Sequence, residues 1–226
     1  MHAYRLTTRA CLRVVPLLMI LMLTACGAGS SSPEAAKDAA GDKDGMKLAY
    51  GISFKVPQGW KVDGMVTAEQ ASTAVLDQRV AAGERVMLAS LNRPADTPEG
   101  KNGIAAIFLV DASKDFPPQA QAAAFTPADL SKYADAILAR DKEEAKKAKG
   151  QSNLLSWTVE KSQNNGMLTL THKGTAKRPD GKLEIYDVNI YLSNGKGIGV
   201  KTLTESSVPG NQEQVRAFVD SIRIAR

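Results

Sequence analysis

The chain of 226 residues is poor in the side chains that most often perform catalysis and bind metals. It contains two histidines, His2 and His172, two cysteines, Cys11 and Cys26, and only 5% aromatic residues. Zinc sites are built mainly from several His and Cys ligands, which this chain cannot supply. We therefore predict no metal site and no cofactor.

Motifs for nucleophilic catalysis and for phosphate binding are also missing. No Gly-x-Ser-x-Gly sequence occurs, so the nucleophile turn of the α/β-hydrolases is excluded. The glycine-rich run at residues 195–199 lies between two predicted strands. A phosphate loop would instead precede a helix, whose N-terminus binds the anion. This run is predicted to be a hairpin turn.

The N-terminal apolar run is too short to remain as a membrane helix. Residues Val14–Leu23 form a run of about ten residues, against the roughly 20 needed to cross a bilayer. Arg5, Arg9 and Arg13 precede or begin the run, and no acidic residue occurs there. A basic segment, a short apolar segment and small residues at the end are typical of a secretory signal peptide. We assign residues 1–25 to it.

Small residues and a cysteine follow the apolar run. The sequence Leu23-Thr24-Ala25-Cys26-Gly27 resembles the lipobox of bacterial lipoproteins. The resemblance implies cleavage between Ala25 and Cys26, and attachment of acyl chains to Cys26. We expect a cell-envelope protein held at the membrane by this lipid anchor. Because Cys11 leaves with the signal peptide, the mature chain has no partner cysteine for a disulfide.

Gly27 bears on the membrane to which the protein is sorted. In enteric-type lipoprotein sorting, an aspartate after the lipidated cysteine resembles an inner-membrane retention signal, and here the residue is Gly27. If the source has two membranes, we expect the periplasmic face of the outer one.

Charge gives little support for nucleic-acid binding. The signal peptide removes three of the 29 basic residues, so the remaining 26 face 24 acidic residues and leave a net charge of +2. A nucleic-acid-binding domain usually carries a strong basic excess. We expect no nucleic-acid partner.

Composition divides the mature chain into two parts. Residues 26–47 are mainly small and charged, without apolar periodicity, which predicts a disordered, lipidated tether. Residues 48–226 alternate between strand-like and helix-like patterns, and their length suits a single domain.

The pattern within 48–226 predicts an α+β fold. Alternating apolar residues or short apolar runs predict strands at 48–56, 85–92, 104–110, 155–159, 167–175, 186–192 and 198–204. Helical spacing predicts helices at 127–149 and near 211–223, the first of them capped by Thr126. Hairpin turns between the later strands imply an antiparallel sheet covered by the helices.

A second resemblance concerns the start and the end of this domain. The segment 50–60, Tyr-Gly-Ile-Ser-Phe-Lys-Val-Pro-Gln-Gly-Trp, resembles the opening strand of PsbP-like and DcrB-like domains, and the ending Phe218-Val219-Asp220-Ser221-Ile222 resembles their last helix. The resemblance implies a three-layer sandwich with an antiparallel sheet between helices. It also implies an accessory role, with no catalytic motif.

The sequence therefore favours a non-catalytic binding or accessory module with an envelope protein partner. His172 is predicted to lie at the surface or at a sheet edge. The segments 93–103 and 111–126 are predicted to be loops, and the partner surface is expected there or at the sheet edge, with Phe116, Phe125 and Trp60 as candidates. The other reading of Trp60, and of Trp157, is a place in the core. Phe108 lies near them in the sequence. The alternatives are an envelope hydrolase that uses acids alone, or a solute-binding lipoprotein.

Overall fold

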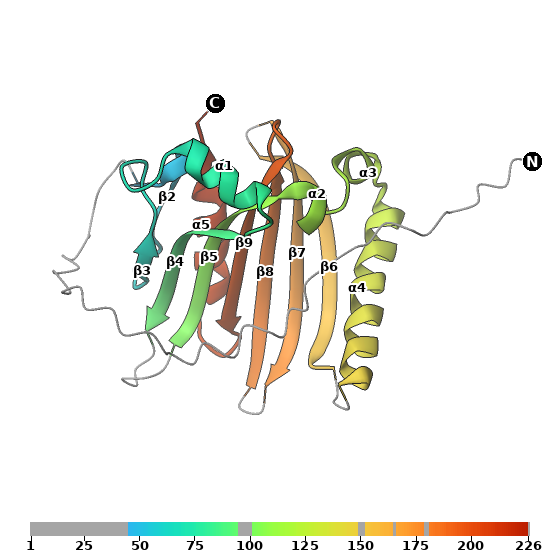
Figure 1. Cartoon of the computed structure of the whole chain (residues 1–226). Helices are drawn as coiled ribbons and strands as arrows, with labels where there is room; N and C mark the ends of the chain where they lie inside the picture. Colours follow the sequence, from blue (N-terminus) through green and yellow to red (C-terminus); the bar gives the residue numbers. More distant parts are fainter. Residues whose placement is uncertain (1–44, 95–100, 149–151, 165, 179–180, 226) are drawn as a thin grey trace, which may run out of the picture.

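The computed structural model describes residues 45–94, 101–148, 152–164, 166–178 and 181–225 (Figure 1). The predicted signal peptide, the cleavage site at Ala25, the lipidated Cys26 and nearly all of the tether lie outside these residues. The described part begins inside the segment predicted as tether.

Seven antiparallel strands form the main sheet, in the order β3-β4-β5-β9-β8-β7-β6. Every pair of neighbours is antiparallel. The strands are β3 (Lys61–Met65), β4 (Val86–Pro94), β5 (Lys101–Asp111), β6 (Leu154–Asn164), β7 (Met167–Arg178), β8 (Gly181–Tyr191) and β9 (Lys196–Glu205). The predicted antiparallel meander is thus confirmed as β6 to β9.

A second, three-stranded sheet joins the two ends of the described chain. It contains β1 (Met46–Lys47), β2 (Ile52–Phe54) and β10 (Arg223–Ile224), with β2 in the middle. The prediction of one strand over 48–56 is wrong, because a 3-10 turn, η2 (Ala49–Gly51), interrupts it. Tyr50 and Gly51 there have φ angles of +67° and +68°, and this left-handed backbone reverses the chain so that β1 pairs with β2. The fold therefore includes β1, which lies before the predicted start at 48.

Two helices match the predicted ones closely. Helix α4 (Pro127–Lys147) begins with a capping box, in which the side chains of Thr126 and Asp129 each accept a hydrogen bond from the other residue's backbone N–H. Helix α5 (Asn211–Ser221) ends two residues earlier than predicted, because Ile222 is extended and leads directly into β10.

Three shorter helices were not predicted. Helix α1 (Thr73–Ala81) buries only Leu76 and Val80, so it has little apolar periodicity to detect. The segment predicted as the loop 111–126 contains α2 (Ala112–Asp115) and α3 (Gln119–Ala124). Helices α2 and α3, together with α4, lie on one side of the main sheet.

Helices cover both faces of the main sheet (Figure 1). We call the face towards α2, α3 and α4 the front face, and the face towards α5 and the small sheet the back face. One buried cluster lies mainly on each side: Phe218 and Ile107 belong to the first, and Phe116 and Trp157 to the second. The predicted three-layer α+β architecture is confirmed.

Candidate functional site

Three ionisable side chains lie next to one another on the front face. The register pairs Lys201 of β9 with Asp187 of β8, and Asp187 with His172 of β7. Directly opposite residues of antiparallel strands point to the same side of the sheet, so the three side chains are neighbours. We call Lys201, Asp187 and His172 the polar row.

His172 is buried at one end of the polar row, with 4% of its surface exposed. Its Nδ1 accepts a hydrogen bond from the indole Nε1 of Trp157 at 3.3 Å, and its Nε2 lies 3.1 Å from the side-chain amide of Asn189. The atom of Asn189 that faces Nε2 is Nδ2. With Nδ1 as an acceptor, the neutral ring carries its proton on Nε2, and turning the Asn189 amide by 180° would place its oxygen there as the acceptor. Both ring nitrogens are therefore occupied.

Burial also fixes the charge of this histidine. Desolvation lowers the pKa of His172 to about 4, and this effect exceeds that of the Asp187 carboxylate, which raises it. The ring is therefore neutral at pH 7. The prediction that His172 lies at the surface or at an edge is wrong, because β6 forms the edge and the Tyr133 ring of α4 packs against the imidazole at 6.0 Å.

The other two members of the polar row form an ion pair. Lys201 Nζ lies 3.1 Å from Asp187 Oδ2, and the side chains are 32% and 11% exposed. The ammonium is thus the more accessible end of the row. It retains hydrogen-bond donors beyond the one used by Asp187, because an ammonium has three N–H groups.

Aromatic and basic side chains close the front face above β6 and β7. Tyr133 packs against Phe125 at 5.7 Å, and burial raises the pKa of Tyr133 to about 12. Lys161 of β6 donates hydrogen bonds to the carbonyl oxygens of Ala123 and Phe125, both at 2.7 Å, at the end of α3. This half of the front face is closed by these contacts.

Two of the three predicted partner-surface residues are buried, so that part of the prediction is wrong. Trp60 is 7% exposed and donates its indole N–H to Gln214 of α5 at 2.9 Å. Phe116 is also 7% exposed and packs edge-on against Tyr191. Phe125 is half-buried and packs against Tyr133.

The front face of β5, and of β9 from Lys201 onward, is only partly buried. Along β5 the back-face residues Ile107 and Leu109 are fully buried, whereas Ile104, Ala106 and Phe108 on the front are only partly buried. These three residues, together with Leu203 of β9 and Met87 of β4, form what we call the open face. Met87 is 47% exposed.

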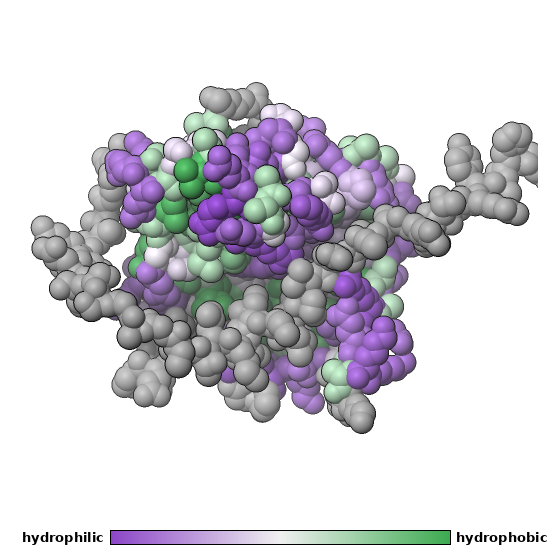
Figure 2. Space-filling view, in the orientation of Figure 1, coloured by the Kyte–Doolittle hydropathy of each residue, from purple (hydrophilic) through white to green (hydrophobic). Residues whose placement is uncertain are grey.

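The helices leave this surface free among the described residues. Helix α4 packs on β6, α3 contacts β7, and α2 contacts the ends of β5 and β9. Helix α1 contacts β4 and β5 through Leu76 and Val80, which belong to the core cluster that contains Ile107 and Leu109. In the view of Figure 2, the surface around α4 is mainly hydrophilic, and the strongest hydrophobic colour gathers at the upper left, around α1 and β2.

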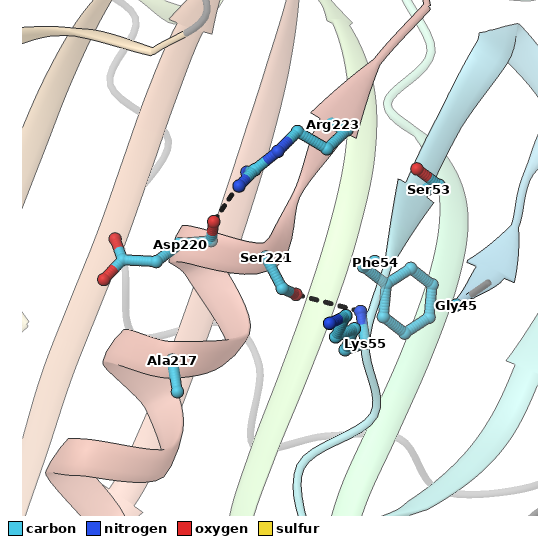
Figure 3. A pocket seen from close by; sticks show the side chains of 8 residues that line it. All are labelled: Gly45, Ser53, Phe54, Lys55, Ala217, Asp220, Ser221 and Arg223. Atoms are coloured by element: carbon cyan, nitrogen blue, oxygen red, sulfur yellow. Dashed lines mark hydrogen bonds between the residues drawn. The ribbon is translucent and has the colours of Figure 1, made fainter. Parts of the chain in front are cut away.

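A pocket of about 440 Å³ lies elsewhere, where β2, α5 and β10 meet (Figure 3). Two of its side chains, Ser221 and Arg223, make hydrogen bonds to the backbone. Ser221 Oγ accepts the backbone N–H of Lys55 at 2.9 Å, and Arg223 donates to the backbone carbonyls of Asp220 and Ile222 at 2.6 and 2.9 Å. We interpret this pocket as a structural junction at the C-terminal end of α5.

Two further features bear on the site. Among the described residues, no group of three or more His, Cys, Asp or Glu side chains is arranged to hold a metal ion. None of the helices in the described ranges is long and apolar enough to cross a membrane.

Comparison with known proteins gives no family. No protein-family model matches the chain, and no curated protein sequence matches it. The fold is similar to solved structures at low sequence identity. PsbP from Synechocystis sp. PCC 6803 has a TM-score of 0.45 and 13% identity, covering 86% of this chain and all of that one.

Two more structures are similar at a TM-score of 0.38. LpqN, involved in cell envelope biogenesis of Mycobacterium tuberculosis, is 11% identical, over 77% of this chain and 83% of that one. A Pseudomonas aeruginosa protein of unknown function is 15% identical, over 63% of this chain and 85% of that one. At these scores the similarities assign neither a family nor a function.

The sequence contained a signal for the polar row that the prediction did not use. On β8, the alternation places Tyr186, Val188 and Ile190 on one face of the strand. Asp187 and Asn189 alternate with them and therefore lie together on the other face. Two polar residues at alternate positions of a long apolar strand indicate a second, partly polar surface.

Proposed function

We propose that this protein is a lipid-anchored module of the cell envelope that binds a protein partner through the open face and catalyses no reaction. The observation that carries the proposal is the partial exposure of Phe108, Ile104 and Leu203 on a sheet face whose other half is closed by helices. Exposed apolar surface rimmed by polar groups is typical of an interaction site.

The environment of His172 supports binding over turnover. A general acid or base works best with a pKa near the working pH and must reach the reacting atom. His172 has a pKa of about 4, is buried, and engages both ring nitrogens with Trp157 and Asn189. Asp187 is held by Lys201. The polar row therefore stabilises the fold, and its Lys201 contributes a positive charge to the surface.

The predicted lipobox supports the proposed attachment to a membrane of the cell envelope. A tether at residues 26–47, as predicted, would keep the open face close to partners in the same membrane, which raises their effective concentration. In a source with two membranes, Gly27 favours the periplasmic face of the outer membrane.

A photocrosslinking amino acid at Met87 tests the proposed surface in living cells. Met87 borders Phe108 on the open face and is 47% exposed, so the probe should give a discrete adduct with one envelope protein. The same probe at Val75 is the matched control, because Val75 is 48% exposed but lies on α1.

The control should give no such adduct. An adduct of equal yield from both positions, or none from Met87 while the protein is folded and membrane-bound, would contradict the proposed surface.

A further inference from the structure

Glycines inside three long strands of the main sheet lie against aromatic rings. A Cβ atom added to Gly103 of β5 would lie 2.8 Å from the Trp60 ring. At Gly174 of β7 it would lie 2.3 Å from the ring of Trp157, and at Gly197 of β9 it would lie 2.2 Å from the ring of Phe116. Each glycine thus lets a ring lie directly on the backbone of the sheet.

Gly199 of β9 differs from these three glycines. No atom of the described residues lies within 4 Å of the position that its Cβ would occupy. Its φ angle is not positive, so the backbone conformation does not require glycine either. Glycine within a strand weakens it, because glycine has more conformational entropy to lose and no side chain to pack.

The neighbours of Gly199 outline a position on the front face. Its register partners are Phe108 of β5 on one side and Asn189 of β8 on the other. Phe116 covers the front face at Gly197, two residues earlier along β9, and Lys201 lies two residues later. Gly199 is itself buried, so this space is a recess between the part of the sheet that Phe116 covers and the partly exposed ammonium of Lys201.

We propose that the backbone at Gly199 receives an aromatic side chain of the partner, and that Lys201 binds a carboxylate next to that side chain. The occupant is a peptide segment in which an aromatic residue and an acidic residue are adjacent. This inference rests on the proposed binding function and names the chemistry of the partner.

Two observations select this chemistry. In this sheet the rings of Trp60, Trp157 and Phe116 pack on glycines, and Phe108 provides an apolar side wall for a further ring. The Lys201 ammonium is 32% exposed and still has N–H groups to donate, so a carboxylate complements it in charge and in hydrogen bonding. A basic partner would instead meet repulsion from Lys201.

Synthetic peptides test the inference on the processed protein in lipid nanodiscs. The probe has the sequence Gly-Ser-Gly-Phe-Glu-Gly-Ser-Gly, and two matched peptides replace Phe by Leu or Glu by Gln. Titration calorimetry should show the Phe-Glu peptide binding about tenfold more tightly than either control.

Variants of Gly199 and Lys201 separate the roles proposed for these two residues. Gly199→Ala should weaken the Phe-Glu peptide about tenfold with no loss in melting temperature, because its Cβ meets no described atom but displaces the ring. Gly64→Ala on β3 is the control, since its Cβ would make only an ordinary contact with Ser90. Lys201→Gln should abolish the preference for Glu over Gln but keep the preference for Phe over Leu.

Equal binding of the three peptides, or unchanged binding by Gly199→Ala, overturns the inference. If the Met87 probe still yields its adduct in that case, the open face binds a partner of other chemistry and the proposed function stands. If the inference fails in this way and the Met87 probe also gives no adduct, the proposed function is wrong as well.

Discussion

His172 shows how burial decides the role of a residue whose type suggests chemistry. Histidine titrates near neutral pH when exposed, which makes it the usual acid–base residue. Here Trp157, Asn189 and the Tyr133 ring surround it, and it remains neutral. The small number of histidines can be read directly from the sequence. The burial of His172, however, depends on β6 and α4 covering β7, which no local pattern reveals.

This environment makes stability depend on pH. The pKa of His172 is about 4 in the folded state and 6.5 in the unfolded state, so between these values the unfolded chain binds a proton that the folded protein does not. The free energy of unfolding should therefore fall by roughly 3 kcal/mol as the pH decreases from 6.5 to 4. Well above pH 6.5 the imidazole is neutral in both states, so the free energy of unfolding no longer changes with pH through His172.

Urea unfolding of the wild type and of His172→Gln between pH 7 and pH 4.5 measures this contribution. The variant lacks the titrating ring and should lose less stability over this range. Parallel curves for the two proteins would show that the buried imidazole is not the cause.

The glycines of β9 give a second prediction at the scale of single residues. Gly197→Ala should lower the free energy of unfolding by about 1–3 kcal/mol, because its Cβ would overlap the ring of Phe116. Gly199→Ala should leave it unchanged or raise it, since nothing described lies there. Thermal denaturation of the two variants compares positions two residues apart. Similar losses in both would mean that strand backbone, not ring packing, requires glycine.

At the scale of elements, the helix that the sequence predicted best is the one with explicit end signals. Thr126, Pro127 and Asp129 mark the start of α4, and the structure shows the complete capping box. Thr126→Ala should reduce the free energy of unfolding by about 1 kcal/mol. Ser131→Ala, at an exposed position on the same helix, is the control and should be neutral. Chemical denaturation that ranks the two variants in the opposite order would contradict the capping argument.

Elements without such signals were missed for identifiable reasons. Helix α1 has Ser72 as its N-cap but only two buried residues, Leu76 and Val80, which is too few to establish helical periodicity. The alternation over 48–56 did suggest a strand. However, the positive φ angle of Tyr50 is a tertiary effect, because the Tyr50 hydroxyl donates to Asp77 of α1 and accepts from Asn194.

At the scale of the whole molecule, the antiparallel sheet covered by helices could be predicted because hairpin turns and apolar alternation are local. The three layers were implied by the resemblance to PsbP-like domains. The candidate site was harder to predict. Phe116 and Trp60 were candidates for the partner surface, whereas both rings pack on glycines, Gly197 and Gly103, that are distant in the sequence. Lys201 and Asp187 meet only through the register of β8 and β9.

Membrane attachment is predicted to depend on Cys26 alone. Cys26→Ala should release the protein from the membrane fraction or leave it as an unprocessed precursor, because the thiol is the expected site of lipidation. Fractionation followed by mass spectrometry of the N-terminus measures both outcomes. A variant that is still cleaved before position 26 and still carries an acyl chain would disprove the assignment.

Limited proteolysis tests the single-domain organisation. The first cuts should fall within 27–44, and the remainder should resist as one unit. Early cleavage inside 153–205, in the strands that form half of the main sheet, would contradict it.

The small sheet has a mechanical consequence if the protein is held by a lipid at its N-terminus, as predicted. Strand β1 pairs with β2 through only two residues, Met46 and Lys47, and β2 is in turn paired with β10 near the C-terminus. A pulling force on the chain before Gly45 would therefore act first on these two pairs. Their rupture would free residues 45–47, roughly 10 Å of chain, whereas Leu48 and Ala49 are buried in the core and would hold the rest of the domain. The two pairs of β1 would thus break before the open face is distorted.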